Sequence, residues 1–248
     1  MSELWMDEAL RTSKLRLGSR FPRDLRADVD MYLPVTTEVM PGLTVSAVRS
    51  ALQRRKIEHH VSDSDRELHG CLVARGGHGF VFLDGADGEA ERRFSLAHEI
   101  AHFIADHLVP RARALEAFGE PIRPVLNGER APTRDERLSA VLARVPLGVQ
   151  VLLMARGPGG AVCTWDVAES ERRADRLAFE LLAPAAAAMA SVQGILGDVE
   201  DPSHHDQRQA AEHLASQFGL PVTEACSYVY LLLSRRRRPL SVEIFGRR

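Results

Sequence analysis

Two histidines four residues apart, His98 and His102, constrain the fold of this chain more than any other feature of its sequence. Around them, from Ser95 to Leu108, apolar residues recur with the period of a helix, which Pro110 is expected to end. Residues four apart lie about one turn apart on one helix face, so both imidazoles can converge on one ion. Without an ion, these histidines would lie buried among apolar neighbours with no evident partner. The pattern therefore predicts a largely buried helix that holds a metal.

Glu99 directly follows the first histidine and completes the sequence H-E-x-x-H. On a helix its side chain points beside the ion, where a carboxylate can take a proton from metal-bound water. Zinc lowers the pKa of such a water to about 7, which makes hydroxide available at neutral pH. The motif predicts a zinc-dependent hydrolase with Glu99 as the general base, and it does not exclude another divalent metal.

A catalytic zinc site needs a third protein ligand and an open fourth position. Leu108 stands where the longer motif H-E-x-x-H-x-x-G-x-x-H has its third histidine, so we expect an acid on another helix. Glu171 is the best candidate and Glu169 the alternative. Asp175 lies four residues after Glu171 on the same face, where it can accept a hydrogen bond from a ligand histidine. This E-x-x-x-D spacing is similar to that of thermolysin-like zinc peptidases. The other interpretation is a solvated helix start, where the helix dipole favours acids.

Two short apolar runs, Gly70–Ala74 and Gly79–Leu83, flank the pair Gly76-Gly77 and predict a β-hairpin directly before the metal helix. Residues 149–154 fit either a strand or a helix, and part of residues 1–30 is expected to be a loose arm. Further helices are expected at Thr44–Arg55, Glu136–Ala143, Glu169–Ala183 and within Asp206–Leu233. This order of elements predicts an α+β fold.

Two blocks of the sequence carry a family resemblance. Residues 93–102, Arg-Phe-Ser-Leu-Ala-His-Glu-Ile-Ala-His, look like R-F-[TS]-x-A-H-E-[IL]-[AG]-H, and residues 171–184 look like E-x-x-A-[ND]-x-F-A-x-x-L-L-x-P. Both are signatures of ImmA/IrrE-type metallopeptidases, which the chain resembles over residues 40–200 and part of the C-terminal unit. Leu177 replaces the usual Phe and Ala183 the usual Met, and both changes keep apolar character. The resemblance implies a zincin-like fold in which a small sheet packs on the H-E-x-x-H helix.

The resemblance also implies an activity and a class of substrate. Members of that family tend to cleave repressor-like DNA-binding proteins, which relieves repression in stress responses or mobile-element control. We therefore expect a zinc endopeptidase that acts on a protein substrate such as a helix-turn-helix repressor. The alternative is a transcription regulator or partner-binding protein that uses the peptidase fold as a sensor. A pure binding module, however, has no need for Glu99 between two ligands.

Zincin folds bind the substrate as an extended strand along an edge strand beside the cleft. Phe80, Val81 and Phe82 are the candidates for that edge strand. The simpler interpretation is that they belong to an ordinary strand of the sheet, and both interpretations can hold together.

We expect two parts in the chain. Residues 1–200 should form the metallopeptidase domain, and residues 204–248 a helical, helix-turn-helix-like extension with a basic tail. The two family blocks lie further apart than is common in the family. Residues 110–165 are therefore expected to contain an insert, whose role the sequence does not indicate.

The helical extension has features of a DNA-binding unit but lacks the side chains for it. Its second helix presents Thr223, Glu224 and Ser227, which suit neither base edges nor phosphates. Arg235–Arg238 could bind phosphate, yet a short basic tail is more often a solvated end. The sequence favours a packing or substrate-docking role and keeps direct DNA binding through residues 211–238 as the lesser alternative.

Composition excludes several other classes of protein. The formal net charge of −2 gives the whole chain no excess of positive charge for nucleic acid. The three cysteines, Cys71, Cys163 and Cys226, form no C-x-x-C pair and argue against a disulfide framework. The first residues resemble no signal peptide, and no run approaches the ~20 apolar residues of a membrane span. We therefore expect a cytoplasmic protein that binds no membrane.

Overall fold

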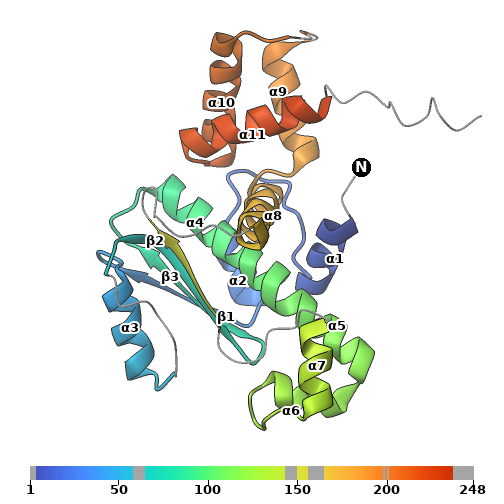
Figure 1. Cartoon of the computed structure of the whole chain (residues 1–248). Helices are drawn as coiled ribbons and strands as arrows, with labels where there is room; N and C mark the ends of the chain where they lie inside the picture. The colour runs from blue at the N-terminus through green and yellow to red at the C-terminus, as the bar shows by residue number, and fades with distance from the viewer. Residues whose placement is uncertain are drawn as a thin grey trace, which may run out of the picture. The chain divides into compact units, whose positions relative to one another are not determined.

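The computed structural model groups the chain into two compact units (Figure 1). One consists of Met1–Leu17 and Asp24–Ala178, and the other of Gly18–Arg23 and Phe179–Arg248. One boundary falls inside helix α8, Trp165–Leu182. The expected division between residues 200 and 204 stays a prediction. The structure describes residues 4–57, 65–142, 150–155, 165–197, 199 and 201–236.

A mixed four-stranded sheet forms the centre of the first unit, in the order β1-β3-β2-β4. β3 runs parallel to β1 and antiparallel to β2, which is antiparallel to β4. The predicted hairpin is confirmed as β2–β3, in which Arg75 pairs with His78 around Gly76-Gly77. Both glycines have positive φ, as a two-residue turn of this kind requires. The strands are β1 (Val35–Met40), β2 (Leu68–Arg75), β3 (His78–Asp84) and β4 (Gln150–Ala155).

β3 lies inside the sheet, which corrects one expectation. Phe80 pairs with Thr36 of β1 on one side and with Val73 of β2 on the other. The backbone of β3 is hydrogen-bonded on both sides, so no substrate strand can add at Phe80, Val81 or Phe82. The prediction that these residues form the substrate edge is wrong. Among the described strands the sheet edges are β1 and β4.

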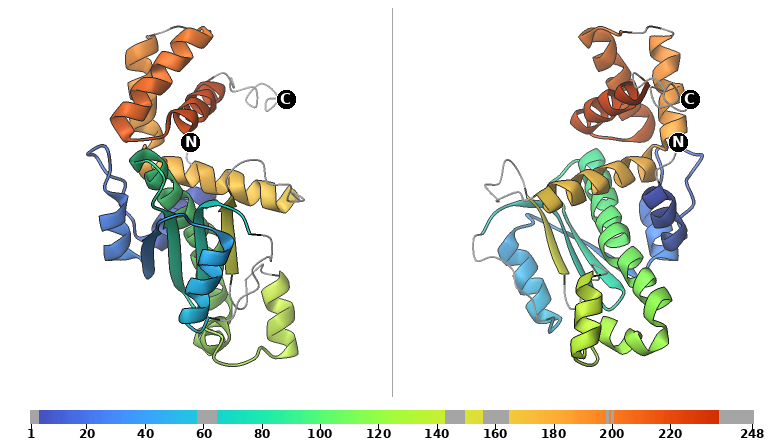
Figure 2. Two further views of the ribbon diagram at one scale, coloured as in Figure 1. Left: turned by 90° about the vertical axis from the view of Figure 1, so that its left-hand side faces the viewer. Right: turned by 45° about the vertical axis from the view of Figure 1, so that its right-hand side comes forward.

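The two faces of the sheet are covered by different helices (Figures 1 and 2). On one face lies α3, Val45–Arg54, which begins where the Thr44 side chain accepts a hydrogen bond from the Ala47 amide. Its apolar positions recur at helical spacing, as predicted, and pack on β2 and β3. The other face carries α4, Glu89–His102, which contacts both β2 and β3. The core under α3 consists of Leu43, Val45, Val48, Ala51, Leu52, Leu68, Cys71, Val73 and Phe82.

α4 continues directly into a π-helical segment, η1, which spans Phe103–Leu108, and then into α5, Val109–Phe118. The prediction that Pro110 ends the helix is wrong. Pro110 occupies the first turn of α5, directly after the π-helical segment, where the helical hydrogen-bonding pattern changes. The metal-motif helix is therefore one part of a longer helical rod.

Two segments of the N-terminal region, residues 4–13 and 25–32, are helices rather than a loose arm. α1 buries Met6 and Ala9, and α2 buries Leu25 and Val29. Between α5 and the last strand, the segment expected to be an insert contains two short helical turns and α7. This segment also supplies β4, so part of it belongs to the central sheet. The bounds are α1 (Leu4–Ser13), α2 (Leu25–Tyr32), η2 (Glu120–Ile122), α6 (Arg123–Leu126) and α7 (Arg134–Leu142).

The second unit contains the end of α8 and three further helices, α9 (Ala185–Leu196), α10 (His204–Phe218) and α11 (Val222–Arg236). Ser203 and Asp206 form a reciprocal capping box at the start of α10. Gly219 ends α10 in the left-handed conformation and allows the tight turn into α11. DNA binding by this unit stays a prediction, since the side chains of Arg235–Arg238 lie outside the described residues.

No single described helix is both long and apolar enough to cross a bilayer. α8 and α9, which meet at an angle of 75°, meet that test only as a bent pair and by length and composition alone.

Candidate metal centre

α4 buries three ionisable side chains together. The exposed fractions of His98, Glu99 and His102 are 4%, 1% and 2%. Ala97, Ile100, Ala101 and Ile104 around them are fully buried, because this side of the helix packs on the sheet. The helical repeat aligns the two imidazoles, whose Nε2 atoms lie 3.1 Å apart.

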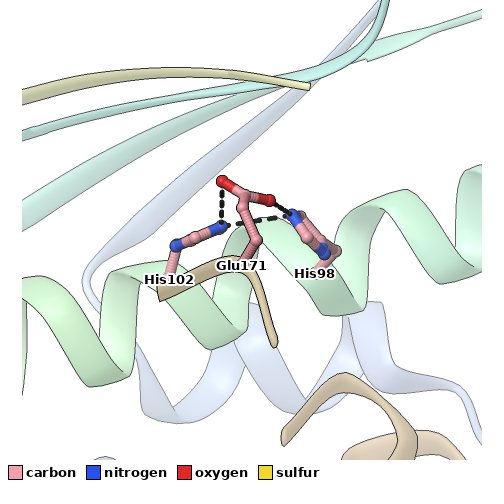
Figure 3. A group of neighbouring side chains, drawn as sticks. All are labelled: His98, His102 and Glu171. Carbon is pink, nitrogen blue, oxygen red and sulfur yellow. Dashed lines mark hydrogen bonds and ion pairs between the residues drawn. The ribbon is translucent and has the colours of Figure 1, made fainter. Parts of the chain in front are cut away.

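Glu171 of α8 reaches across to both histidines (Figure 3). Its Oε2 lies 3.3 Å from Nε2 of His98, and its Oε1 lies 3.5 Å from Nε2 of His102. One atom from each of the three side chains lies within 4.8 Å of the others, so the group could hold a metal ion. The alternative ligand, Glu169, pairs instead with Arg172 on its own helix at 2.6 Å.

The opposite edge of each imidazole faces a carboxylate. Nδ1 of His98 lies 2.9 Å from Oδ1 of Asp175, and Nδ1 of His102 lies 2.7 Å from Oδ2 of Asp106. A carboxylate accepts the Nδ1 hydrogen, which leaves the lone pair of a neutral imidazole on Nε2. When both imidazoles are neutral, two Nε2 lone pairs and the Glu171 carboxylate converge on one point. That set of donors calls for a cation, and two imidazoles with one carboxylate are a common ligand set of catalytic zinc.

The pKa values of the three clustered side chains also indicate a site that binds a cation. Burial lowers the pKa of His98, but hydrogen bonds with Asp175 and Glu171 outweigh it and raise the pKa to about 10. For His102, burial is likewise outweighed by Asp106 and Glu171, and its pKa is raised to about 9. Hydrogen bonds from His102 and His98 hold the pKa of Glu171 far below its usual range. The cluster therefore attracts positive charge, which either protons or a metal ion can supply.

Glu99 is the one member of the H-E-x-x-H sequence that stays apart from the cluster. Its two carboxylate oxygens are buried and have no hydrogen-bond partner among the described residues. Burial raises its pKa to about 7, although the neighbouring His98 and His102 act to lower it. A buried carboxylate without a partner costs stability, so its retention suggests a chemical use. A carboxyl group with this pKa can accept and return a proton near neutral pH.

The comparisons agree with this geometry. Residues 49–123 match the family described as the IrrE N-terminal-like domain. This stretch is therefore a domain of the ImmA/IrrE metallopeptidase family. The stretch that matches contains His98, Glu99 and His102 and ends before Glu171, which the structure adds to them. No curated protein and no solved structure matches the chain.

Sequence reasoning missed two residues that contact the functional side chains of this metallopeptidase domain. Gly70 of β2 borders the general-base candidate, since a Cβ added there would stand 2.8 Å from Oε1 of Glu99. Asp106 holds His102, and its position four residues later was the available signal. His107, the next histidine along the chain, binds the hairpin turn: its Nε2 accepts a hydrogen bond of 3.0 Å from the Gly77 amide.

Proposed function

We propose that the protein is a zinc-dependent endopeptidase that hydrolyses peptide bonds of a regulatory, repressor-like protein. The observation that carries the proposal is the convergence of His98, His102 and Glu171 beside Glu99. The buried carboxylate of Glu99 has no hydrogen-bond partner within the described part of the chain. Three donors suit a catalytic zinc site with one open position, and the fourth residue has the place of a general base.

Each residue of the site has a separate role in hydrolysis. His98, His102 and Glu171 would hold the metal, and Asp175 would fix the ring of His98. Bound zinc would supply a Lewis acid that polarises the peptide carbonyl and makes water a stronger acid. Glu99 takes the proton from the attacking water and passes it to the nitrogen of the leaving amine.

A substrate strand has a better place to bind than the one expected from sequence. Among the described strands β4 lies at an edge of the sheet, and its Met154 pairs with Gly70, the residue that borders Glu99. An extended peptide that adds to the free edge of β4 would therefore run along the strand next to the catalytic residues. Both the repressor-like substrate and the cytoplasmic location stay predictions, and the family resemblance supports the first.

The alternative, a regulator that uses the fold only as a sensor, is less well supported. A sensor needs the three ligands but not a buried carboxylate that has no partner among the described residues. Such a group lowers stability and would be easily replaced where no proton has to move.

Metal analysis of the purified full-length protein tests the proposal first. We expect about one zinc per chain in the wild type. The double variant His98→Ala, His102→Ala should contain almost none, and equal zinc in both proteins would contradict the metal site.

Cleavage is tested by incubating the zinc-loaded protein with repressor proteins encoded near its gene. We expect defined fragments whose appearance stops when a chelator is added and resumes when zinc is restored. Fragments that form equally with Glu99→Gln would come from a contaminating protease.

A further inference from the structure

Oδ2 of Asp106 makes two contacts at once. It lies 2.7 Å from Nδ1 of His102 and accepts a hydrogen bond of 2.8 Å from the hydroxyl of Ser170. Ser170 directly precedes Glu171 on α8. One oxygen atom thus joins a ligand histidine on the metal-motif helix to the turn of α8 that carries the third ligand.

The two ligand histidines are held from different directions. His98 is held by Asp175, which lies on α8, whereas His102 is held by Asp106 from its own helical rod. Asp106 lies in η1, where the hydrogen-bonding pattern changes from α to π. π-helical turns are rare and occur frequently at functional sites. The side chain of His102 is 2% exposed and that of Asp106 is 28% exposed, so their contact is largely shielded from water.

We propose that Asp106 and Ser170 act as a positioning pair for the metal site. Asp106 accepts the Nδ1 hydrogen of His102, so that Nε2 presents its lone pair to the ion. Ser170, through the same oxygen, fixes the first part of α8 at the distance at which Glu171 meets both histidines. Neither residue touches the reacting atoms. This inference rests on the proposed metal site and adds the residues that assemble it.

The experiment measures metal binding rather than activity. Zinc affinity is determined by competition with a chelator of known affinity, and the cobalt-substituted protein gives a visible absorption spectrum that reports ligand geometry. The variants are Asp106→Ala, Asp106→Asn, Ser170→Ala and the double variant Asp106→Ala, Ser170→Ala. Glu169→Ala is the matched control, because Glu169 adjoins Ser170 but its carboxylate pairs with Arg172.

We expect Asp106→Ala to weaken zinc binding about 10–100-fold and to change the cobalt spectrum. Asp106→Asn should restore much of the affinity, because the amide oxygen can still accept the Nδ1 hydrogen. Ser170→Ala should lose less than Asp106→Ala, and the double variant should bind no worse than Asp106→Ala, because both act through one oxygen. Glu169→Ala should match the wild type.

Several outcomes would overturn the proposal. A merely structural role for Asp106 would lower the melting temperature while leaving affinity and the cobalt spectrum of the folded protein unchanged. Losses that multiply in the double variant would show that Ser170 and Asp106 act separately. If Asp106→Ala does not fold, the Asp106→Asn and Ser170→Ala variants test the proposal instead. Wild-type cobalt spectra in both variants would refute the pairing. A wild type that binds no metal would instead refute the proposed function, and this inference with it.

Discussion

The backbone of Gly70 lies against the carboxylate of Glu99. A Cβ at residue 70 would stand 2.8 Å from Oε1 of Glu99, closer than real Cβ atoms approach, and 3.1 Å from its Cγ. Because residue 70 of β2 has no side chain, there is room for the carboxylate of Glu99, the general-base candidate. The absence of a side chain at one position of the sheet is what allows a buried acid at the opposing position of α4.

Gly70→Ala should displace the Glu99 carboxylate and abolish most of the hydrolytic activity while zinc stays bound. A shift of about 1 Å in a catalytic group can cost roughly 100-fold in rate. Steady-state kinetics on the substrate, together with metal analysis, would check this. Gly194→Ala in α9 is the control, since a Cβ there meets nothing within 4 Å and activity should not change. Full activity in Gly70→Ala would show that Glu99 has room to move.

Glu99→Gln should keep the metal and the fold but abolish hydrolysis, because the amide cannot accept the proton. The metal-free variant should also unfold at a higher temperature than the metal-free wild type. Its amide replaces a buried carboxylate that has no partner among the described residues, a gain of about 1 kcal/mol. Thermal unfolding monitored by circular dichroism measures the gain. Turnover at the wild-type rate would exclude Glu99 as the base.

Substitutions on α8 should rank by their distance from the ion. Glu171→Ala leaves two protein ligands and should lose most of the metal. Asp175→Ala removes only the partner of His98 and should cost about 10–100-fold in metal affinity. Glu169→Ala should be nearly silent, because that carboxylate pairs with Arg172. Chelator competition measures all three, and a Glu169 effect as large as that of Glu171 would reverse the assignment.

Tyr228→Phe should destabilise the second unit without changing metal binding. The Tyr228 hydroxyl donates a buried hydrogen bond of 2.8 Å to the Ala183 carbonyl. The ring of Tyr228 stacks on that of Phe179, with the two ring centroids 4.3 Å apart. Phenylalanine keeps the stacking and loses the hydrogen bond, which should cost about 1 kcal/mol in the free energy of unfolding. Denaturant unfolding gives the difference. Tyr230→Phe, on the same helix but 72% exposed, should have no effect.

The parts of the site that depend on local sequence could be predicted. His98, Glu99 and His102 follow from the helical repeat alone, and Glu171 lies in a recognisable block on a helix with clear periodicity. Gly70 could not be predicted, because its role is a contact between β2 and α4 that no local pattern encodes.

The fold was predictable where apolar residues form a continuous run or a helical repeat, and not where they do neither. β2 and β3 are apolar runs around a glycine turn, so their pairing was evident. β1 buries only Val35, at its first residue, and gives no alternating pattern. Without β1, the sequence pattern predicts β3 at the edge of the sheet, whereas β1 pairs with it in the structure. The sequence predicts a helix end at Pro110, because it does not show that the helix continues through a π-helical segment into α5.

The ligands of the cluster lie on two helices that are distant in the chain. His102 and Glu171 are 69 positions apart (171 − 102 = 69). One ion bound to both residues would close a loop of the chain that contains α5, α7 and β4. By the chain-entropy estimate used for a disulfide, closing a loop of this length removes freedom from the unfolded chain equivalent to about 4 kcal/mol. A chain nicked anywhere inside that loop would keep its two fragments tethered for as long as the ion remained.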